Sequence, residues 1–222
     1  METIDYAALR RQMIETIANH ALLVGNDIGK QGLGNRVMEV MGRVARHEFV
    51  PAELRPHAYN DHPLPIGFGK TISQPFMVAL MTDLLDVQAS DSVLEIGTGV
   101  GYQAAVLADL AEKVYTVEII GELALAAQSR LEDLGYANVE VRLGDGSKGW
   151  PEHAPFDKVI VTAAPELVPP SLIMQLKPGG RMVVPAGLED DQRLMLVEMD
   201  DAGSLKTREV LRVVFSPLVT IH

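Results

Sequence analysis

The stretch that decides the fold is VLEIGTGVGYQAAVLA, residues 93–108. A short apolar run ends in Gly97, Gly99 and Gly101, and a run of small apolar residues follows. This order predicts a β-strand, a glycine turn and a helix, the place where a doubly wound sheet lets a ligand approach bare backbone. Taken alone, the glycines also fit a tight structural turn that binds nothing.

The pattern around this stretch predicts an α/β protein with a doubly wound, Rossmann-like parallel sheet. Beyond residue 90, short β-prone runs alternate with helical ones, which is typical of right-handed crossovers. The predicted strands are 92–96, 114–118, 139–143, 158–162 and 181–185, with helices from about residues 102, 121 and 170. We expect a turn at 177–180 to stop the last helix. Residues 193–199 and 209–215 read as an antiparallel pair at one edge.

The first 75 residues read differently from the rest. Apolar residues at 6, 9, 13 and 17, and again at 37, 40, 41 and 44, recur at helical spacing. Residues 21–35 read as a connection, and 55–75 hold too many prolines and glycines for a regular element. Another amphipathic helix begins at Phe76. We therefore expect residues 1–75 to form a helical cap with a substrate loop, and 76–222 the core, in one compact unit.

Composition narrows the functional class. The 222-residue chain is 47% apolar and carries a formal net charge of −11, so a long nucleic-acid surface is not expected. There is no cysteine, hence no thiolate nucleophile. No apolar run has the length of a membrane span, and the opening residues do not resemble a signal peptide. We expect a cytoplasmic, monomeric enzyme without a membrane or nucleic-acid partner.

The ligand is predicted from the acids near the glycines. Glu118 ends the second strand, where a carboxylate can accept ribose hydroxyls. The spacing is GxGxG rather than GxGxxG, and Glu95 precedes the loop, where a carboxylate would repel a pyrophosphate and suit a cationic sulfonium. This favours S-adenosylmethionine. Asp145 can accept from the adenine amino group beside Gly146, although Asp before Gly is also a common turn. We include Thr98 of the loop in the cofactor site.

Four stretches carry a resemblance to a known family: 57–75, HAYNDHPLPIGFGKTISQP; 93–108; 141–166, VRLGDGSKGWPEHAPFDKVIVTAAPE; and 176–187, LKPGGRMVVPAG. Over residues 36–218 the chain resembles the protein-L-isoaspartate(D-aspartate) O-methyltransferases. The resemblance implies a seven-stranded methyltransferase fold that moves the methyl of S-adenosylmethionine onto the free carboxyl of isoaspartyl, and D-aspartyl, residues in damaged proteins. The resulting ester then collapses to a succinimide, whose hydrolysis returns some normal aspartate.

The expected reaction does not need a general base from the enzyme. A carboxyl group ionises near pH 4, so the acceptor is already a nucleophile at neutral pH. The segment VTAAPE after the fourth strand favours an oxygen acceptor over a base amine. The family's active-site serine matches Ser73 in ISQP, where a hydroxyl can orient one acceptor oxygen. Alternatively, Ser73 is the N-cap of the helix that begins at Phe76.

Further residues are assigned to the substrate site. The resemblance places the small residues Thr162 and Ala163 beside the substrate, and an extended peptide can pair near Val214. We add Asp61 and Lys70, the latter standing where family members commonly have glutamine. The long link over 20–35 is a second departure. A metal site at Asp61 and its flanking histidines is not expected, because no further ligand completes the set.

Three other functions share parts of this pattern. A methyltransferase for a small-molecule acid or hydroxyl would use the same cofactor residues. A protein that binds S-adenosylmethionine without catalysis is a second alternative. A dinucleotide-dependent oxidoreductase is the third, and its usual glycine spacing is absent here.

Overall fold

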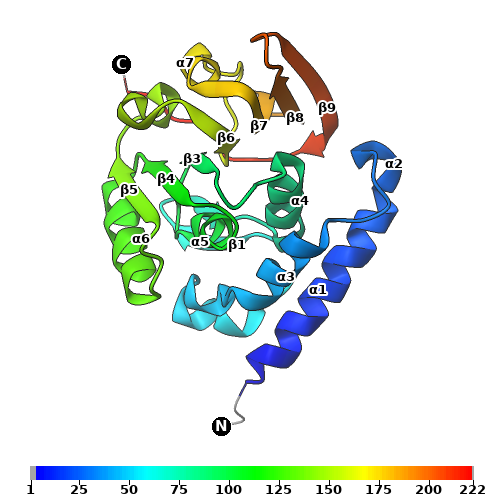
Figure 1. The fold of residues 1–222 in the computed structure, drawn as a ribbon. Coiled ribbons are helices and arrows are strands. Elements are labelled where there is room, and N and C mark those ends of the chain that lie inside the picture. The colour runs from blue at the N-terminus through cyan, green and yellow to red at the C-terminus, as the bar shows by residue number, and fades with distance from the viewer. Residues whose placement is uncertain (1–3, 222) are drawn as a thin grey trace.

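The computed structural model describes residues 4–221 and contains a seven-stranded sheet in the order β5-β4-β3-β6-β7-β8-β9. Strands β3 to β7 run parallel, and β8 and β9 add an antiparallel pair at one edge, as predicted. The order steps outward in both directions from β3, so the sheet is doubly wound (Figure 1). Its strands are β3 Ser92–Ile96, β4 Lys113–Glu118, β5 Val139–Leu143, β6 Phe156–Val161, β7 Leu176–Leu188, β8 Asp191–Met199 and β9 Leu205–Val213.

Helices cover the sheet and extend beyond it. Helices α4, α5 and α6 contact the parallel strands, and α1 and α3 pack against α4, so that α1 lies along the outside (Figure 1). The α-helices are α1 Tyr6–Leu23, α2 Gly25–Ile28, α3 Asn35–Arg43, α4 Pro75–Leu85, α5 Tyr102–Ala108, α6 Gly121–Asp133 and α7 Pro170–Met174. The 3-10 helices are η1 Arg46–Glu48, η2 Ala52–His57, η3 Gly146–Lys148 and η4 Pro151–His153. Among residues 4–221, no helix is long and apolar enough to cross a membrane.

Two segments predicted to be irregular contain ordered elements. Within 21–35, α1 continues to Leu23 and α2 follows directly. Within 55–75, a small antiparallel hairpin forms from β1, Leu64–Gly67, and β2, Lys70–Ile72. Its turn contains consecutive left-handed residues, Gly67 to Gly69, and such a turn reverses the chain within very few residues.

The predicted turn at residues 177–180 is wrong. Helix α7 already ends at Met174, and β7 runs through the Lys-Pro-Gly-Gly segment. Gly180 sits so close to its neighbours that an added Cβ would meet the carbonyl oxygens of Lys177 and Asp157. The glycine therefore allows a close approach of β6 and β7, where the register shifts, instead of a chain reversal.

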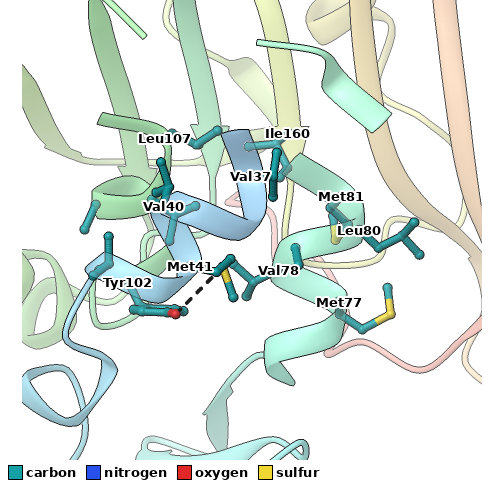
Figure 2. Close-up of a cluster of buried hydrophobic side chains, with 14 of the residues drawn as sticks. Val37, Val40, Met41, Met77, Val78, Leu80, Met81, Tyr102, Leu107 and Ile160 are labelled. Carbon is teal, nitrogen blue, oxygen red and sulfur yellow. Dashed lines mark hydrogen bonds between the residues drawn. The ribbon is translucent and has the colours of Figure 1, made fainter. Parts of the chain in front are cut away.

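One large apolar core joins the outer helices to the sheet. Val40 and Met41 of α3, Val78 of α4 and Leu107 of α5 are buried together with Ile160 of β6 (Figure 2). The core continues without interruption from α1 to β9. Because each buried side chain of this size contributes about 1.5–3 kcal/mol, the outer helices are part of the folded unit rather than a loose attachment.

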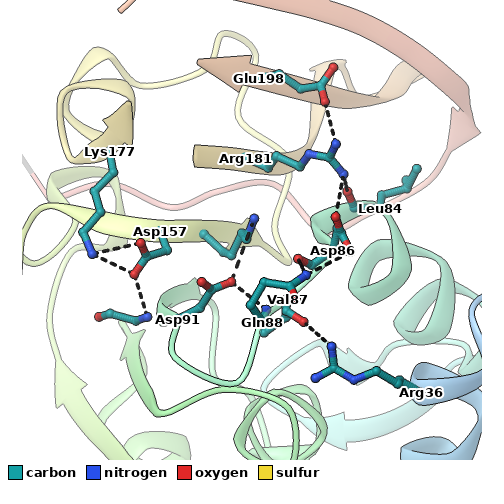
Figure 3. A network of polar contacts seen from close by, with 12 residues as sticks. Arg36, Leu84, Asp86, Val87, Gln88, Asp91, Asp157, Lys177, Arg181 and Glu198 are labelled. Carbon is teal, nitrogen blue, oxygen red and sulfur yellow. Dashed lines mark hydrogen bonds and ion pairs between the residues drawn. The ribbon is translucent and has the colours of Figure 1, made fainter. Parts of the chain in front are cut away.

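The amino ends of the parallel strands carry a network of paired charges. Lys177 donates to both oxygens of Asp157, at 2.9 and 2.8 Å, and Arg181 contacts Glu198 at 3.1 Å (Figure 3). Asp157 also accepts from the backbone N–H of Ser92, the first residue of β3. The charged side chains at this end of the sheet are therefore largely paired with one another.

Candidate active site

The three glycines lie at the opposite end of the sheet, where β3 meets α5. All three have left-handed backbone, with φ of +95° at Gly97, +54° at Gly99 and +89° at Gly101. An added Cβ at Gly97 would collide with the side chain of Thr162, which comes from the end of β6. The loop is thus held tightly against β6 and exposes its backbone, as the sequence predicts.

Glu118 ends β4 next to this loop. One carboxylate oxygen accepts from the backbone N–H of Gly99 at 2.8 Å, and the other from Ile119 and Ile120, both at 3.0 Å. A carboxylate offers about four acceptor positions. Within the described chain, three are used and one remains on the oxygen that faces Gly99.

Asp145 follows β5 and forms the N-cap of η3. One oxygen accepts from the N–H and the hydroxyl of Ser147, and the other from the backbone N–H of Ile221 at 3.0 Å. Burial opposes ionisation, but these hydrogen bonds hold the pKa of Asp145 below its usual value. The oxygen that accepts from Ile221 also lies 3.7 Å from Nζ of Lys148. Asp145 is therefore both a turn residue and a carboxylate paired with a largely exposed ammonium.

The Glu95 carboxylate does not face the cofactor cavity, where the sequence pattern predicted that it would meet a cationic sulfonium. Its side chain is fully buried between β3 and β4, accepts from the hydroxyl of Thr116 at 2.5 Å, and does not line the cavity beside the glycines. Burial raises the pKa of Glu95 to about 8, so the neutral acid predominates at pH 7. Thr98 joins the same chain of polar groups, 2.7 Å from the Thr116 hydroxyl. Glu95 and Thr98 therefore stabilise the glycine loop through this buried chain of hydrogen bonds.

A cavity brings together half of the residues predicted to bind the cofactor, and Glu95, Thr98, Gly101 and Asp145 do not line it. It lies over Gly97 and Gly99 and is bounded by Glu118 and Gly146. An added Cβ at Gly146 would meet the side chain of Ile96, so this residue has to be small. Lys70, Thr162 and Ala163 line the same cavity.

A broader groove of about 720 Å³ lies beside the cavity. Ser73, Thr162 and Val214 line it, and Val214 is 89% exposed. Lys70 and Ala163 do not line the groove. Thr71 and Thr162 line both spaces, so the cavity and the groove meet at the carboxyl ends of the strands.

Asp61 was expected in the substrate site, and its carboxylate has another position. It accepts from the N–H of Phe76 at 2.8 Å and from the side chains of Gln74 and His20 at 3.0 and 3.1 Å. Asp61 does not line the groove. Since Asp61 caps α4 from outside that helix, the proposed N-cap role of Ser73 is wrong.

The sequence pattern did not predict that residues 216–219 belong to the site. Residues 216–219 cross the mouth of the cavity and line it, joined to the end of β6 by hydrogen bonds at Ala164. The apolar run from 213 to 221 resembles a core strand, and only its proline hints at an irregular path. Among residues 4–221, no group of three His, Asp or Glu side chains is placed to hold a metal ion.

A doubly wound sheet with a GxGxG loop, an acid after the second strand and an aspartate after the third defines the S-adenosylmethionine-dependent methyltransferase class. The comparisons with known proteins give the family. The model for protein-L-isoaspartate(D-aspartate) O-methyltransferase matches residues 19–222. This chain belongs to that family.

Individual relatives agree over nearly the whole chain. The chain is 59% identical to protein-L-isoaspartate O-methyltransferase 1 of Polaromonas sp. over 96% of its own length and 91% of the relative. It is 55% identical to enzyme 2 of Syntrophobacter fumaroxidans, covering 98% and 88%. A solved structure named protein-L-isoaspartate O-methyltransferase matches with a TM-score of 0.80 and 28% identity, over 94% of this chain and 65% of that one. A Plasmodium falciparum structure described by the same enzyme name, solved with S-adenosyl-L-homocysteine, matches in fold with a TM-score of 0.77 and 20% identity.

Proposed function

We propose that this chain transfers the methyl group of S-adenosylmethionine to the free carboxyl of L-isoaspartyl, and D-aspartyl, residues in damaged proteins. The observation that carries the proposal is the meeting of the glycine-loop cavity with the groove at Thr71 and Thr162. A methyl donor in the cavity and a peptide in the groove would face each other there. Family membership supplies the reaction class.

The residues of the cavity fit the cofactor. The free acceptor position of Glu118 suits a ribose hydroxyl, and Asp145, which adjoins Gly146 of the cavity, is our candidate for the adenine amino group. Gly97 and Gly99 leave room for the sulfonium and methionine end, and Gly146 for the ring. Gly101 shapes the turn, because an added Cβ would crowd Leu131 at 3.1 Å. When bound, the cofactor supplies an electrophilic methyl group.

The chain's own contribution is alignment and exclusion of water. A cofactor held over Gly97 and Gly99 would give its methyl group to the acceptor carboxylate as the carbon–sulfur bond breaks, which would leave a neutral thioether and a neutral ester. No proton moves, so no general base is required. Holding the two reactants in line can lower the barrier by up to about 7–11 kcal/mol.

Ser73 is our candidate for orienting the acceptor. It lies between β2 and α4, half-buried at the groove, and its carbonyl oxygen accepts a hydrogen bond from Arg46 at 2.7 Å. Its hydroxyl makes no hydrogen bond to another described residue. It is therefore free to donate to the acceptor oxygen that does not attack.

Other side chains take secondary roles in this proposal. Val214, directly after β9, offers exposed backbone to an extended peptide. Thr162 and Ala163 keep the junction narrow. Lys70 lines the cavity rather than the groove, so its ammonium acts closer to the cofactor than we expected.

The direct test is methyl transfer from labelled S-adenosylmethionine to two peptides that differ only in isoaspartate or aspartate at one position. We expect base-labile label on the isoaspartyl peptide alone. Label on neither peptide, with S-adenosylhomocysteine still bound, would overturn the acceptor assignment and leave the cofactor assignment standing. Label on small organic acids instead would favour the small-molecule alternative.

A further inference from the structure

Arg46, in η1, is a fully buried arginine behind the active-site segment. Its Nε donates to the carbonyl of Ala58 at 2.8 Å, and Nη2 donates to the carbonyl of Ser73 at 2.7 Å. The guanidinium carbon lies 4.8 Å from the ring centroid of Tyr102, the first residue of α5. One side chain therefore connects the loop before β1, the candidate serine and the helix that follows the glycines.

The fully buried guanidinium carries a desolvation cost that its contacts offset only in part. Within residues 4–221, no carboxylate forms an ion pair with Arg46, and its buried Nη1 has no acceptor. Burial lowers the pKa of Arg46 to about 10, which still leaves the group charged at pH 7. The contact with Ser73 points to a role in the site.

The contacts of Ser73 indicate what that role is. The residues after Ser73 are held by Asp61, through the side chain of Gln74 and the N–H of Phe76. Arg46 holds Ser73 itself, through its carbonyl. Arg46 thus fixes the peptide unit that joins Ser73 to Gln74, and Asp61 fixes the residues that follow, so the backbone that carries the serine hydroxyl is held directly by Arg46.

We propose that Arg46 is a positioning residue for methyl transfer, fixing the backbone of Ser73 so that its hydroxyl meets the acceptor carboxylate. The inference rests on the role of Ser73 given under the proposed function. A planar guanidinium donates to two carbonyls at once while its face lies on an aromatic ring. Lysine keeps the charge but lacks this fork, so Arg46→Lys separates the geometry from the charge.

The test measures steady-state kinetics on the isoaspartyl peptide and binding of S-adenosylhomocysteine. For Arg46→Lys we expect kcat to fall about tenfold or more, the loss of one well-placed charged hydrogen bond. The dissociation constant for S-adenosylhomocysteine stays within about twofold, because the cavity residues are unchanged. Val197→Ala, in a buried position of β8 away from both spaces, is the control for lost stability and should keep the wild-type kcat.

A double-mutant cycle separates positioning from general loosening. If Arg46 acts through Ser73, adding Arg46→Lys to Ser73→Ala lowers kcat by much less than it does in the wild type. Additive losses would overturn the proposal, as would a wild-type kcat in Arg46→Lys or an equal loss in Val197→Ala. If Arg46→Lys does not fold, Arg46→Ala is assayed with methylguanidinium and with neutral methylurea; rescue of kcat by methylguanidinium alone supports the proposal, and equal rescue or none contradicts it. Failure of the wild type to label the isoaspartyl peptide would instead refute the proposed function.

Discussion

The two ends of the parallel sheet are built in opposite ways. At the amino ends, Lys177 pairs with Asp157 and Arg181 with Glu198, so the charges satisfy one another (Figure 3). At the carboxyl ends, left-handed glycines expose backbone, and Glu118 keeps one acceptor position unused among the described residues. The difference teaches where a ligand fits: at one end the charged groups are paired with one another, and at the other end backbone and a carboxylate oxygen remain available.

The largest expected effect comes from filling the space over the glycine loop. Gly97→Ala places a Cβ against Thr162 at a left-handed backbone position. Backbone strain and displacement of the loop should cost about 3 kcal/mol of binding free energy. This cost would weaken S-adenosylhomocysteine binding roughly 100-fold. Calorimetric titration measures this. Wild-type affinity in the variant would show that the loop does not form the cofactor site.

Ser73→Ala sharpens the comparison within the functional end. Loss of a hydrogen bond to a charged acceptor costs about 1.5–3 kcal/mol, so kcat should fall about 10- to 100-fold. S-adenosylhomocysteine affinity should remain near the wild-type value. Full activity of the variant on the isoaspartyl peptide would remove Ser73 from the mechanism.

The features that the sequence predicts depend on neighbouring residues, and those that it does not predict depend on contacts between residues far apart in the chain. Strands β3, β4 and β6 and the glycine loop follow from local apolar runs and glycine spacing, which are properties of neighbouring residues. The capping of α4 by Asp61 joins residues 15 positions apart, and the contact of Ile221 with Asp145 joins residues 76 apart. Such pairs depend on the finished fold. The burial of Glu95 was missed because an acid at a strand end reads as a site residue until both neighbouring strands are in place.

The pKa shifts of Glu95 and Asp157 predict opposite dependences of folding stability on pH. Burial raises the pKa of Glu95 to about 8 in the folded protein from an ordinary value of 4.5. Its contribution to stability is complete below pH 4.5 and is lost as the pH rises towards 8, with each tenfold difference in proton affinity worth about 1.4 kcal/mol. Glu95→Gln should therefore lose less stability than the wild type between pH 5 and 8 in urea unfolding. Parallel curves for the two proteins would contradict the buried, neutral Glu95.

Asp157 provides the matched test at the amino end. Burial raises its pKa, but hydrogen bonds from Lys177 and from the Ser92 N–H outweigh this and hold the pKa of Asp157 below its ordinary 3.8. Its contribution is present above pH 3.8 and disappears as the pH falls through the lower, folded value. Asp157→Asn should cost about 1 kcal/mol at pH 7 and leave kcat unchanged. A fall in kcat without a fall in stability would break the division between the two ends.

The smallest expected effect is that of Lys70→Gln, which removes the ammonium and keeps a polar side chain. Lys70 is only partly buried at the cavity, so solvent screens its charge, and we expect a change of about threefold in S-adenosylmethionine affinity. The KM for the isoaspartyl peptide should change less. If the peptide KM changes more than cofactor affinity, Lys70 belongs to the acceptor site, as its sequence position first suggested.

The measurement that tests the central claim most directly is a titration followed through backbone amide NMR signals. S-adenosylhomocysteine is added first, and then the isoaspartyl or the matched aspartyl peptide. We predict that the isoaspartyl peptide shifts the signals of Thr71, Thr162 and Val214, where the cavity and the groove meet, and leaves Ser92, Asp157 and Arg181 unchanged. Equal shifts with both peptides, or shifts confined to the amino end of the sheet, would contradict the account.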